Sequence, residues 1–255
     1  MIDLQNITKR YGDTVAVDTV SLSVSKGELL VLLGESGSGK TTTLKMINRL
    51  IDATSGVIRL DGEDIRGVPV HILRRRVGYV FQKVGLFPHM TVAENIGITP
   101  SLLGWDAVRI QKRVAELLEM VELNPVAVGG RRPSELSGGQ QQRVGVARAL
   151  AAAPKVMLLD EPFGALDPLT RDRLQQSFSR IRREHHLTAI FVTHDMVEAL
   201  ILGDRIAVMR NGHLIQLGTP HELMVMPAGD YVQQLMGTPK RQAYLVEKLL
   251  AEDPE

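Results

Sequence analysis

The sequence predicts an α/β protein with a mainly parallel sheet, an antiparallel β subdomain at the N-terminus and a helical subdomain insert. Three patterns predict this architecture. Residues 2–24 alternate apolar and polar side chains, short apolar runs elsewhere alternate with helical segments, and residues 84–153 have helical periodicity. We therefore expect one α/β core that a helical segment interrupts.

The N-terminal elements follow from alternation and from turn residues. The run over 2–24 is broken at Gly12-Asp13, which predicts an antiparallel hairpin. The continuous apolar run over 28–33 predicts a buried strand, and a helix is expected over 40–50. Two further short strands are expected at 57–60 and 77–81.

The helical insert and the C-terminal half follow from the same patterns. Ile110, Val114 and Leu117 recur at helical spacing, which predicts an amphipathic helix in the insert. Beyond Pro154 the strand and helix patterns alternate again. We expect strands at 156–159 and 188–192, a helix at 170–184, and a hairpin formed by 206–209 and 214–217.

Composition excludes several classes of protein. The 255 residues include no cysteine, which excludes disulfide scaffolds, thiolate metal sites and cysteine nucleophiles. Thirty basic and 29 acidic side chains give a net charge of +1, so no global charge excess indicates nucleic acid or disorder. We expect no signal peptide, and no apolar run approaches the ~18 residues of a membrane span. Any membrane role is therefore expected to depend on a partner.

A phosphate-binding loop is predicted between the strand at 28–33 and the following helix. The segment fits the pattern G-x-x-x-x-G-K-[ST], whose glycines let backbone N–H groups surround phosphate oxygens at a helix N-terminus. Lys40 is placed to reach the β- and γ-phosphates, and the Thr41 hydroxyl is placed to bind Mg²⁺. The alternative is a glycine-rich turn without a ligand. The predicted ATP-binding residues here are Gly34, Glu35, Ser36, Gly37, Ser38, Gly39, Lys40, Thr41 and Thr42.

Two carboxylates end the apolar strand at 156–159. Asp160 is expected to stabilise the metal from this strand tip, and Glu161 is expected to orient or activate a water near the γ-phosphate. The alternative is a strand that ends in a solvated acidic turn. The preceding phosphate loop favours the catalytic interpretation.

A second anion-binding surface is predicted at Leu136-Ser137-Gly138-Gly139-Gln140, just before a helix. This segment lies in the insert, far along the chain from the first loop. One nucleotide touches both loops of one chain only if the insert folds over. A second copy of the chain removes this difficulty, because its segment can close the site.

Taken together, these motifs make the sequence resemble the ATP-binding subunit of ABC (ATP-binding cassette) transporters. The resemblance covers residues 1–235, and its motifs occur in the family's order. It implies a P-loop NTPase core with the helical subdomain at about 84–153. The remaining residues 236–255 are expected to form a short C-terminal tail without CBS modules.

The resemblance implies roles for further residues. Gln82 matches the glutamine of the glutamine loop, which implies that it contacts the metal together with Thr41 and Asp160. His194 matches the switch histidine that binds the γ-phosphate. Tyr11 matches the adenine platform. Ala165-Leu166-Asp167 matches the D-loop, in which Asp167 couples two sites across a dimer. The implied assembly is an ATP sandwich with Mg²⁺, in which the partner copy's signature segment closes each site through Ser137, Gly138, Gly139 and Gln140.

The resemblance also implies partners. Residues 85–92 and 46–51 resemble importers of quaternary amines and osmoprotectants, such as glycine betaine and choline. In the family the segment 84–92 receives a short helix of an integral membrane permease, and an extracytoplasmic solute-binding protein acts indirectly. The alternative for 84–92 is packing of the insert on the core. The chain is then expected to be peripheral, at the cytoplasmic face of the membrane. The alternatives are an exporter or lipid-transport ATPase, a soluble non-transport ABC ATPase and a small-molecule P-loop kinase.

Basic clusters at 74–76, 131–132 and 180–183 are expected to form solvated faces. The alternative for 74–76 is proximity to an anionic membrane surface.

Overall fold

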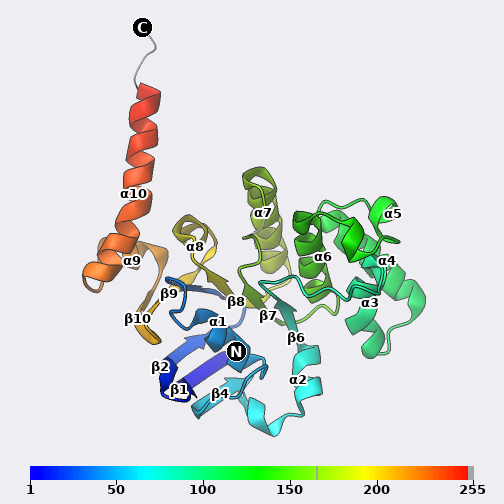
Figure 1. Cartoon of the computed structure of the whole chain (residues 1–255), viewed down its shortest axis with the longest axis horizontal. Coiled ribbons are helices and arrows are strands. Elements are labelled where there is room, and N and C mark those ends of the chain that lie inside the picture. Colours follow the sequence, from blue (N-terminus) through cyan, green and yellow to red (C-terminus); the bar gives the residue numbers. More distant parts are fainter. Residues whose placement is uncertain (165, 252–255) are drawn as a thin grey trace.

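The computed structural model describes residues 1–164 and 166–251, apart from several side chains beyond residue 241. The chain forms two sheets and a group of helices, so the predicted α/β class is confirmed. Figure 1 shows the N-terminal strands in blue, the helical segment from α3 (Val92–Leu102) to α6 (Gly138–Leu150) in green, and α10 (Asp230–Ala251) extending away from the sheets toward the C-terminus.

The smaller sheet is antiparallel and contains the predicted N-terminal hairpin. Its strand order is β2-β1-β4-β5, and Tyr11 pairs with Thr14 at the tip of the hairpin. Alternate residues of the first two strands are buried, as the apolar periodicity predicts. The strands are β1 (Ile2–Tyr11), β2 (Thr14–Val24), β4 (Ser55–Leu60) and β5 (Glu63–Asp64).

The larger sheet has the order β10-β9-β3-β8-β7-β6, with β10 antiparallel to an otherwise parallel sheet. In register, Leu33 of β3 lies beside Thr193 of β8, and Asp160 of β7 lies beside Val192. The carboxyl ends of these strands therefore meet at one edge of the sheet. The strands are β3 (Leu29–Leu33), β6 (Val77–Val80), β7 (Val156–Asp160), β8 (Thr188–Thr193), β9 (Arg205–Arg210) and β10 (His213–Gly218).

Both faces of the larger sheet are buried, which explains the continuous apolar run of β3. Leu29, Val31 and Leu33 belong to a core shared with the helical segment and with the helices after β7. Leu30 and Leu32 face a second core, which the first helix and the antiparallel sheet complete. Alternate side chains of one strand thus enter different cores.

The regular elements between residues 84 and 153 are helices. They are α3 (Val92–Leu102), α4 (Ala107–Met120), α5 (Pro125–Val128), the short 3-10 turn η2 (Pro133–Glu135) and α6 (Gly138–Leu150). The other helices are α1 (Lys40–Ile47), η1 (Ile65–Gly67), α2 (Val70–Arg76), α7 (Pro168–Glu184), α8 (Met196–Leu202), α9 (Pro220–Val225) and α10 (Asp230–Ala251). Among the described residues, no helix combines the length and the apolar composition that a membrane crossing requires.

Three details differ from the sequence expectations. Helix α1 ends at Ile47 because Arg49 has a left-handed backbone, with φ +46°, which a helix cannot continue. Helix α10 runs without a break through the expected boundary at residue 235. Arg182 is not solvated: its side chain is 11% exposed and donates to Asp204 at 2.6 Å and to the carbonyl of Gly27 at 3.0 Å.

Candidate functional site

The phosphate loop lies between β3 and α1 and is held against neighbouring backbone. At Gly39, φ is +100°, and a Cβ atom would lie 2.7 Å from the carbonyl oxygen of Ala16. At Gly34, a Cβ atom would collide with the carbonyl oxygen of Met209. Glycine is therefore required at both positions, because the loop passes directly over β2 and β9.

Lys40 closes the loop from within. Its ammonium group donates to the carbonyls of Gly34 and Glu35, each at 2.7 Å, and to the Ser38 hydroxyl at 3.3 Å. The Lys40 side chain is buried, and this desolvation lowers its pKa, against the opposing charges of Glu161 and Asp160. A cation is thus held in the concave side of the loop, where it faces any bound phosphate.

Thr41 and Asp160 join the loop to the tip of β7. The Thr41 hydroxyl donates to the Asp160 carboxylate at 2.8 Å. Asp160 is 3% exposed, and burial raises its pKa, which the Thr41 hydrogen bond partly opposes. The structure therefore keeps two hard oxygen donors side by side under the first turn of α1.

These oxygens fit a magnesium ion that a nucleotide carries into the site. Mg²⁺ prefers oxygen ligands, keeps several waters and takes few protein ligands beside substrate phosphates. Among the described residues, no group of three or more histidine, aspartate or glutamate side chains forms a self-sufficient metal site. A hydroxyl and a carboxylate beside a phosphate loop match a magnesium site that is completed by nucleotide phosphates. They do not match a metal site built from protein ligands alone.

Glu161 has side-chain contacts on both of its carboxylate oxygens. Gln82 donates its amide N–H to Oε2 at 3.2 Å, and His194 Nδ1 lies 3.3 Å from Oε1. The backbone at Glu161 is left-handed, with φ +46°, and its N–H donates to the carbonyl of Val192 at 3.0 Å. Such strain in a residue other than glycine persists where the surrounding structure imposes it, often at functional sites.

A cavity of about 370 Å³ opens over these groups. It brings together two regions that are 79 residues apart at Gln82 and Glu161, and it places both beside the phosphate loop. The predicted residues that line it are Ser36, Gly37, Ser38, Gly39, Lys40, Thr41, Thr42, Gln82 and Glu161. Ala16 of β2 also lines it, although no local pattern distinguishes this alanine from others in a strand.

Several predicted residues do not line this cavity. Gly34, Glu35, Asp160 and His194 contact its lining residues by hydrogen bonds or close approach. Tyr11 lies at the hairpin tip and is 50% exposed, with the Lys9 ammonium 4.9 Å from its ring centroid.

The signature segment and Asp167 lie at helix N-termini. Ser137 forms a capping box with Gln140 at the start of α6: the Gln140 N–H donates to the Ser137 hydroxyl at 3.3 Å, and the Gln140 side chain accepts from the Ser137 N–H at 2.9 Å. Asp167 caps α7, and hydrogen bonds from Thr170 lower its pKa. Neither group lines the cavity in the single chain, and Ala165 lies outside the described residues.

Two polar side chains, the half-buried Arg148 and the buried Asn95, hold the segment that follows Gln82, and the sequence analysis missed both. The Arg148 guanidinium, from α6, donates to the carbonyls of Gly85 at 2.8 Å and Val84 at 3.1 Å. Asn95, from α3, accepts from the Phe87 N–H at 2.8 Å and donates back to the Phe87 carbonyl at 3.1 Å. Their sole sequence signal is a polar residue on the buried face of an otherwise apolar helix.

The strand–loop–helix cradle, the buried lysine and the carboxylates at the neighbouring strand tip define the class of P-loop nucleotide-binding proteins. Family comparison then narrows the class. The model of the ABC transporter family matches residues 17–164, and the chain belongs to this family.

Relatives with known roles are about half identical to the chain. It is 50% identical to the choline transport ATP-binding protein OpuBA of Bacillus subtilis, over 93% of this chain and 62% of the relative. It is 51% identical to the osmoprotectant import ATP-binding protein OsmV of Salmonella typhimurium, over 93% of this chain and 63% of OsmV. It is 50% identical to the glycine betaine uptake system ATP-binding protein YehX of Escherichia coli, over 93% of this chain and 77% of YehX. The chain thus spans less than two thirds of the first two relatives.

Solved structures of ABC cassettes have the same fold. A dimeric bacterial ABC transporter cassette, MJ0796, superposes with a TM-score of 0.82 at 35% identity, over 86% of this chain and 99% of that one. A dimeric post-hydrolysis state of the same cassette, bound to ADP and phosphate, superposes with a TM-score of 0.81 at 33% identity. The superposition again covers 86% of this chain and 99% of that one.

Proposed function

We propose that this chain is the ATP-hydrolysing subunit of an ABC importer. It powers uptake of a small solute, a quaternary amine or osmoprotectant, through a separate permease. Family membership and the transport roles of OpuBA, OsmV and YehX support this proposal. The observation that carries the hydrolytic part of the proposal is the contact of Glu161 with both Gln82 and His194 beside the phosphate loop.

In this proposal the phosphate loop binds ATP. The loop amides and Lys40 hold the β- and γ-phosphates, and Tyr11 stacks on adenine. Thr41, Asp160 and Gln82 would hold Mg²⁺, which would neutralise charge on the transferred phosphoryl group. Burial of Lys40 favours this role, because a desolvated cation interacts strongly with an arriving anion.

Glu161 is the proposed general base for ATP hydrolysis. A carboxylate beside the γ-phosphate accepts a proton from the attacking water, which moves in line with the bond to the leaving ADP. Gln82 holds one oxygen of Glu161, and His194 contacts the other, so the carboxylate has one defined orientation. In this role His194 also donates a hydrogen bond to the γ-phosphate.

A second copy completes the proposed site. Ser137, Gly138, Gly139 and Gln140 lie apart from the cavity of their own chain, and they present a helix N-terminus that favours an anion. In a head-to-tail dimer they close the ATP of the partner, while Asp167 couples the two sites. The dimeric assemblies of the MJ0796 cassette support this arrangement.

The proposed permease contact lies on the helical subdomain, about 84–153, of a cassette that spans 1–235. A mostly apolar groove of about 660 Å³ lies between α3 and α4, with Met90, Gly97 and Ile110 in its walls. Asn95 fixes the adjoining segment through its contacts with Phe87. A short helix of a membrane subunit fits such a groove. The chain then lies at the cytoplasmic face of the membrane, and an extracytoplasmic binding protein delivers the solute to the permease.

The variant Glu161→Gln tests the catalytic assignment. It preserves shape and hydrogen bonding but removes the base, so we expect retained ATP binding, hydrolysis lowered by at least about 100-fold, and a trapped ATP-bound dimer. Glu184→Gln, at the exposed end of α7, is the matched control and is expected to hydrolyse ATP at the parent rate. Parent-like turnover by Glu161→Gln would show that another residue is the base.

Co-purification tests the transport assignment. The tagged chain is isolated from native membranes in mild detergent, and its partners are identified by mass spectrometry. A permease with an extracytoplasmic binding protein is the expected result, and binding assays on that protein identify the solute. A permease without a binding protein favours export or lipid traffic, and no membrane partner contradicts the transport proposal.

A further inference from the structure

A second large cavity lies at the opposite edge of the larger sheet from the phosphate loop. It has a volume of about 630 Å³ and lies between α4 and the start of β8. Thr188, the first residue of β8, lines it, whereas His194 at the other end of this strand contacts Glu161. Six residue steps at about 3.3 Å each separate Thr188 from His194 by about 20 Å. We call this space the edge cavity.

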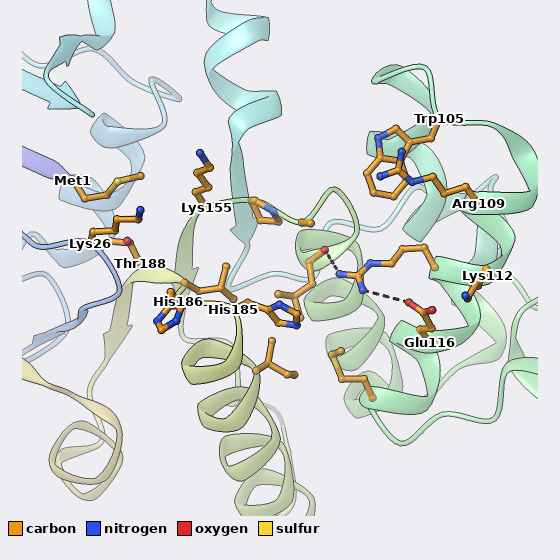
Figure 2. Close-up of a pocket in the computed structure, with 17 residues that line it drawn as sticks. Met1, Lys26, Trp105, Arg109, Lys112, Glu116, Lys155, His185, His186 and Thr188 are labelled. Carbon is orange, nitrogen blue, oxygen red and sulfur yellow. Dashed lines mark hydrogen bonds and ion pairs between the residues drawn. The ribbon is translucent and has the colours of Figure 1, made fainter.

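The two walls of the edge cavity come from different parts of the fold. Figure 2 shows Lys26, Lys155 and Thr188 on one wall, which belongs to the α/β core. Arg109 and Lys112 of α4 lie on the other wall, on the helical segment. The cavity thus spans the junction between these two units.

Both walls carry cations on a lining that is otherwise largely apolar. Among the described lining residues, five are lysine or arginine, and Glu116 is the one carboxylate. Glu116 is already paired with Arg113 at 3.5 Å, and Arg113 also donates to the carbonyl of Leu150 at 3.1 Å. Lys26, Arg109, Lys112 and Lys155 form no ion pair with any described carboxylate. In a chain of net charge +1, this is a strong local excess of positive charge.

Arg109 is held in place for an anion. Its guanidinium carbon lies 3.6 Å from the ring centroid of Trp105, a stacked cation–π contact that restricts the side chain. Stacking leaves the edge of a guanidinium open, and this edge matches two phosphate oxygens at once. His185 and His186 add two imidazoles on the core side of the cavity.

Size and charge together define the class of ligand. The volume is within the range of about 300–1,000 Å³ that small-molecule sites occupy. The four cations that lack a carboxylate partner are exposed residues around a largely apolar hollow, so a ligand with several negative charges gains most from them. The concave shape of the site favours a small ligand over a flat membrane surface. The edge cavity is also separate from the apolar groove, because the two are lined by different residues of α4.

We propose that the edge cavity binds a soluble anion with two or more phosphate groups, which bridges α4 and the α/β core. The ligand class includes free oligophosphates and nucleotides. A bridging ligand ties the helical segment to the core at a distance from the phosphate loop. The inference goes beyond the proposed function, because binding here does not require ATP hydrolysis.

Direct binding tests the inference in a chain whose phosphate loop is weakened by Lys40→Ala. Calorimetric titration at about 150 mM salt compares pyrophosphate with ADP, which carries the same two phosphate groups on a nucleoside. We expect saturable binding of one molecule per chain. Equal affinities identify an oligophosphate site, and at least tenfold tighter ADP binding at this cavity identifies a nucleotide site.

Variants of each wall locate the binding. Lys26→Ala with Lys155→Ala, and separately Arg109→Ala with Lys112→Ala, are each expected to weaken binding at least tenfold. A control pair, Arg131→Ala with Lys248→Ala, removes equal charge from exposed positions outside the cavity and is expected to bind as the parent does.

Three results would overturn the inference. They are the absence of saturable binding, unchanged binding when either wall is altered, and equal loss in the control pair. Matching unfolding temperatures of all variants exclude loss of binding through misfolding.

Discussion

The replacement Gly39→Ala tests how tightly the phosphate loop is held against β2. Gly39 has φ +100°, and a Cβ atom there lies 2.7 Å from the carbonyl oxygen of Ala16. Gly62 is a matched control, because it has a similar backbone, with φ +83°, but no atom within 4 Å of a Cβ. The two variants share the cost of a positive φ, and the steric contact is added for Gly39 alone.

The magnitudes follow from these two contributions. A residue other than glycine with positive φ costs about 1–2 kcal/mol, which is the whole expected loss for Gly62→Ala. An added methyl group in a packed site costs about 1–3 kcal/mol more, because a backbone carbonyl must shift. Gly39→Ala is therefore expected to lose about 2–5 kcal/mol of unfolding free energy.

Thermal unfolding of the nucleotide-free chain measures the difference. In a domain of this size, 1 kcal/mol lowers Tm by about 2–4 °C. Gly62→Ala is therefore expected to unfold a few degrees below the parent, and Gly39→Ala about 2–12 °C lower still. Equal unfolding temperatures for the two variants would refute the argument that the β2 backbone confines the loop.

Three further changes test other features. Asp160→Asn removes a carboxylate whose pKa burial raises, so the nucleotide-free variant should gain about 0.5–2 kcal/mol at neutral pH. The Asp160 carboxyl of the parent holds its proton more tightly in the native state than in the unfolded state. The stability gained by Asp160→Asn should therefore shrink as the pH falls toward 4 in urea titrations, and a gain independent of pH would contradict the raised pKa. Arg182→Ala should cost about 1.5–3 kcal/mol, whereas Arg66→Ala, which removes an exposed side chain, should leave Tm nearly unchanged; equal shifts in Tm would contradict this contrast. Asn95→Ala removes the hydrogen bonds that a buried amide makes to the Phe87 backbone and should cost about 2–4 kcal/mol by chemical denaturation, with a near-neutral result excluding its positioning role.

The fold was predictable where local pattern and tertiary environment agree. The alternation over 2–24 and the apolar run of β3 each correspond to observed strands, because burial on one face or on both faces leaves a direct mark on the sequence. The end of α1 was not predictable: Arg49 turns left-handed to donate to the carbonyls of Ile65 and Val68, which lie beyond the next strands.

The candidate site shows the same division. The phosphate loop is contiguous, so its spacing alone predicts a cradle, and Glu161 follows a recognisable buried strand. The contact of Gln82 with Glu161 depends on two strands being neighbours, which spacing does not reveal. The edge cavity is still less visible, because its cations are scattered from Lys26 to Lys155 and form no sequence cluster. The clusters that the sequence does show lie elsewhere, and one of them contains the structural Arg182.

Helix α6 has a mechanical consequence for the two ends that it joins. Ser137 caps its first turn, and Arg148 near its last turn holds the carbonyls of Val84 and Gly85. Thirteen helical residues form a stiff rod of about 20 Å. In the proposed dimer, a displacement of the loop after Gln82 is therefore passed along this stiff helix to the signature segment at its other end.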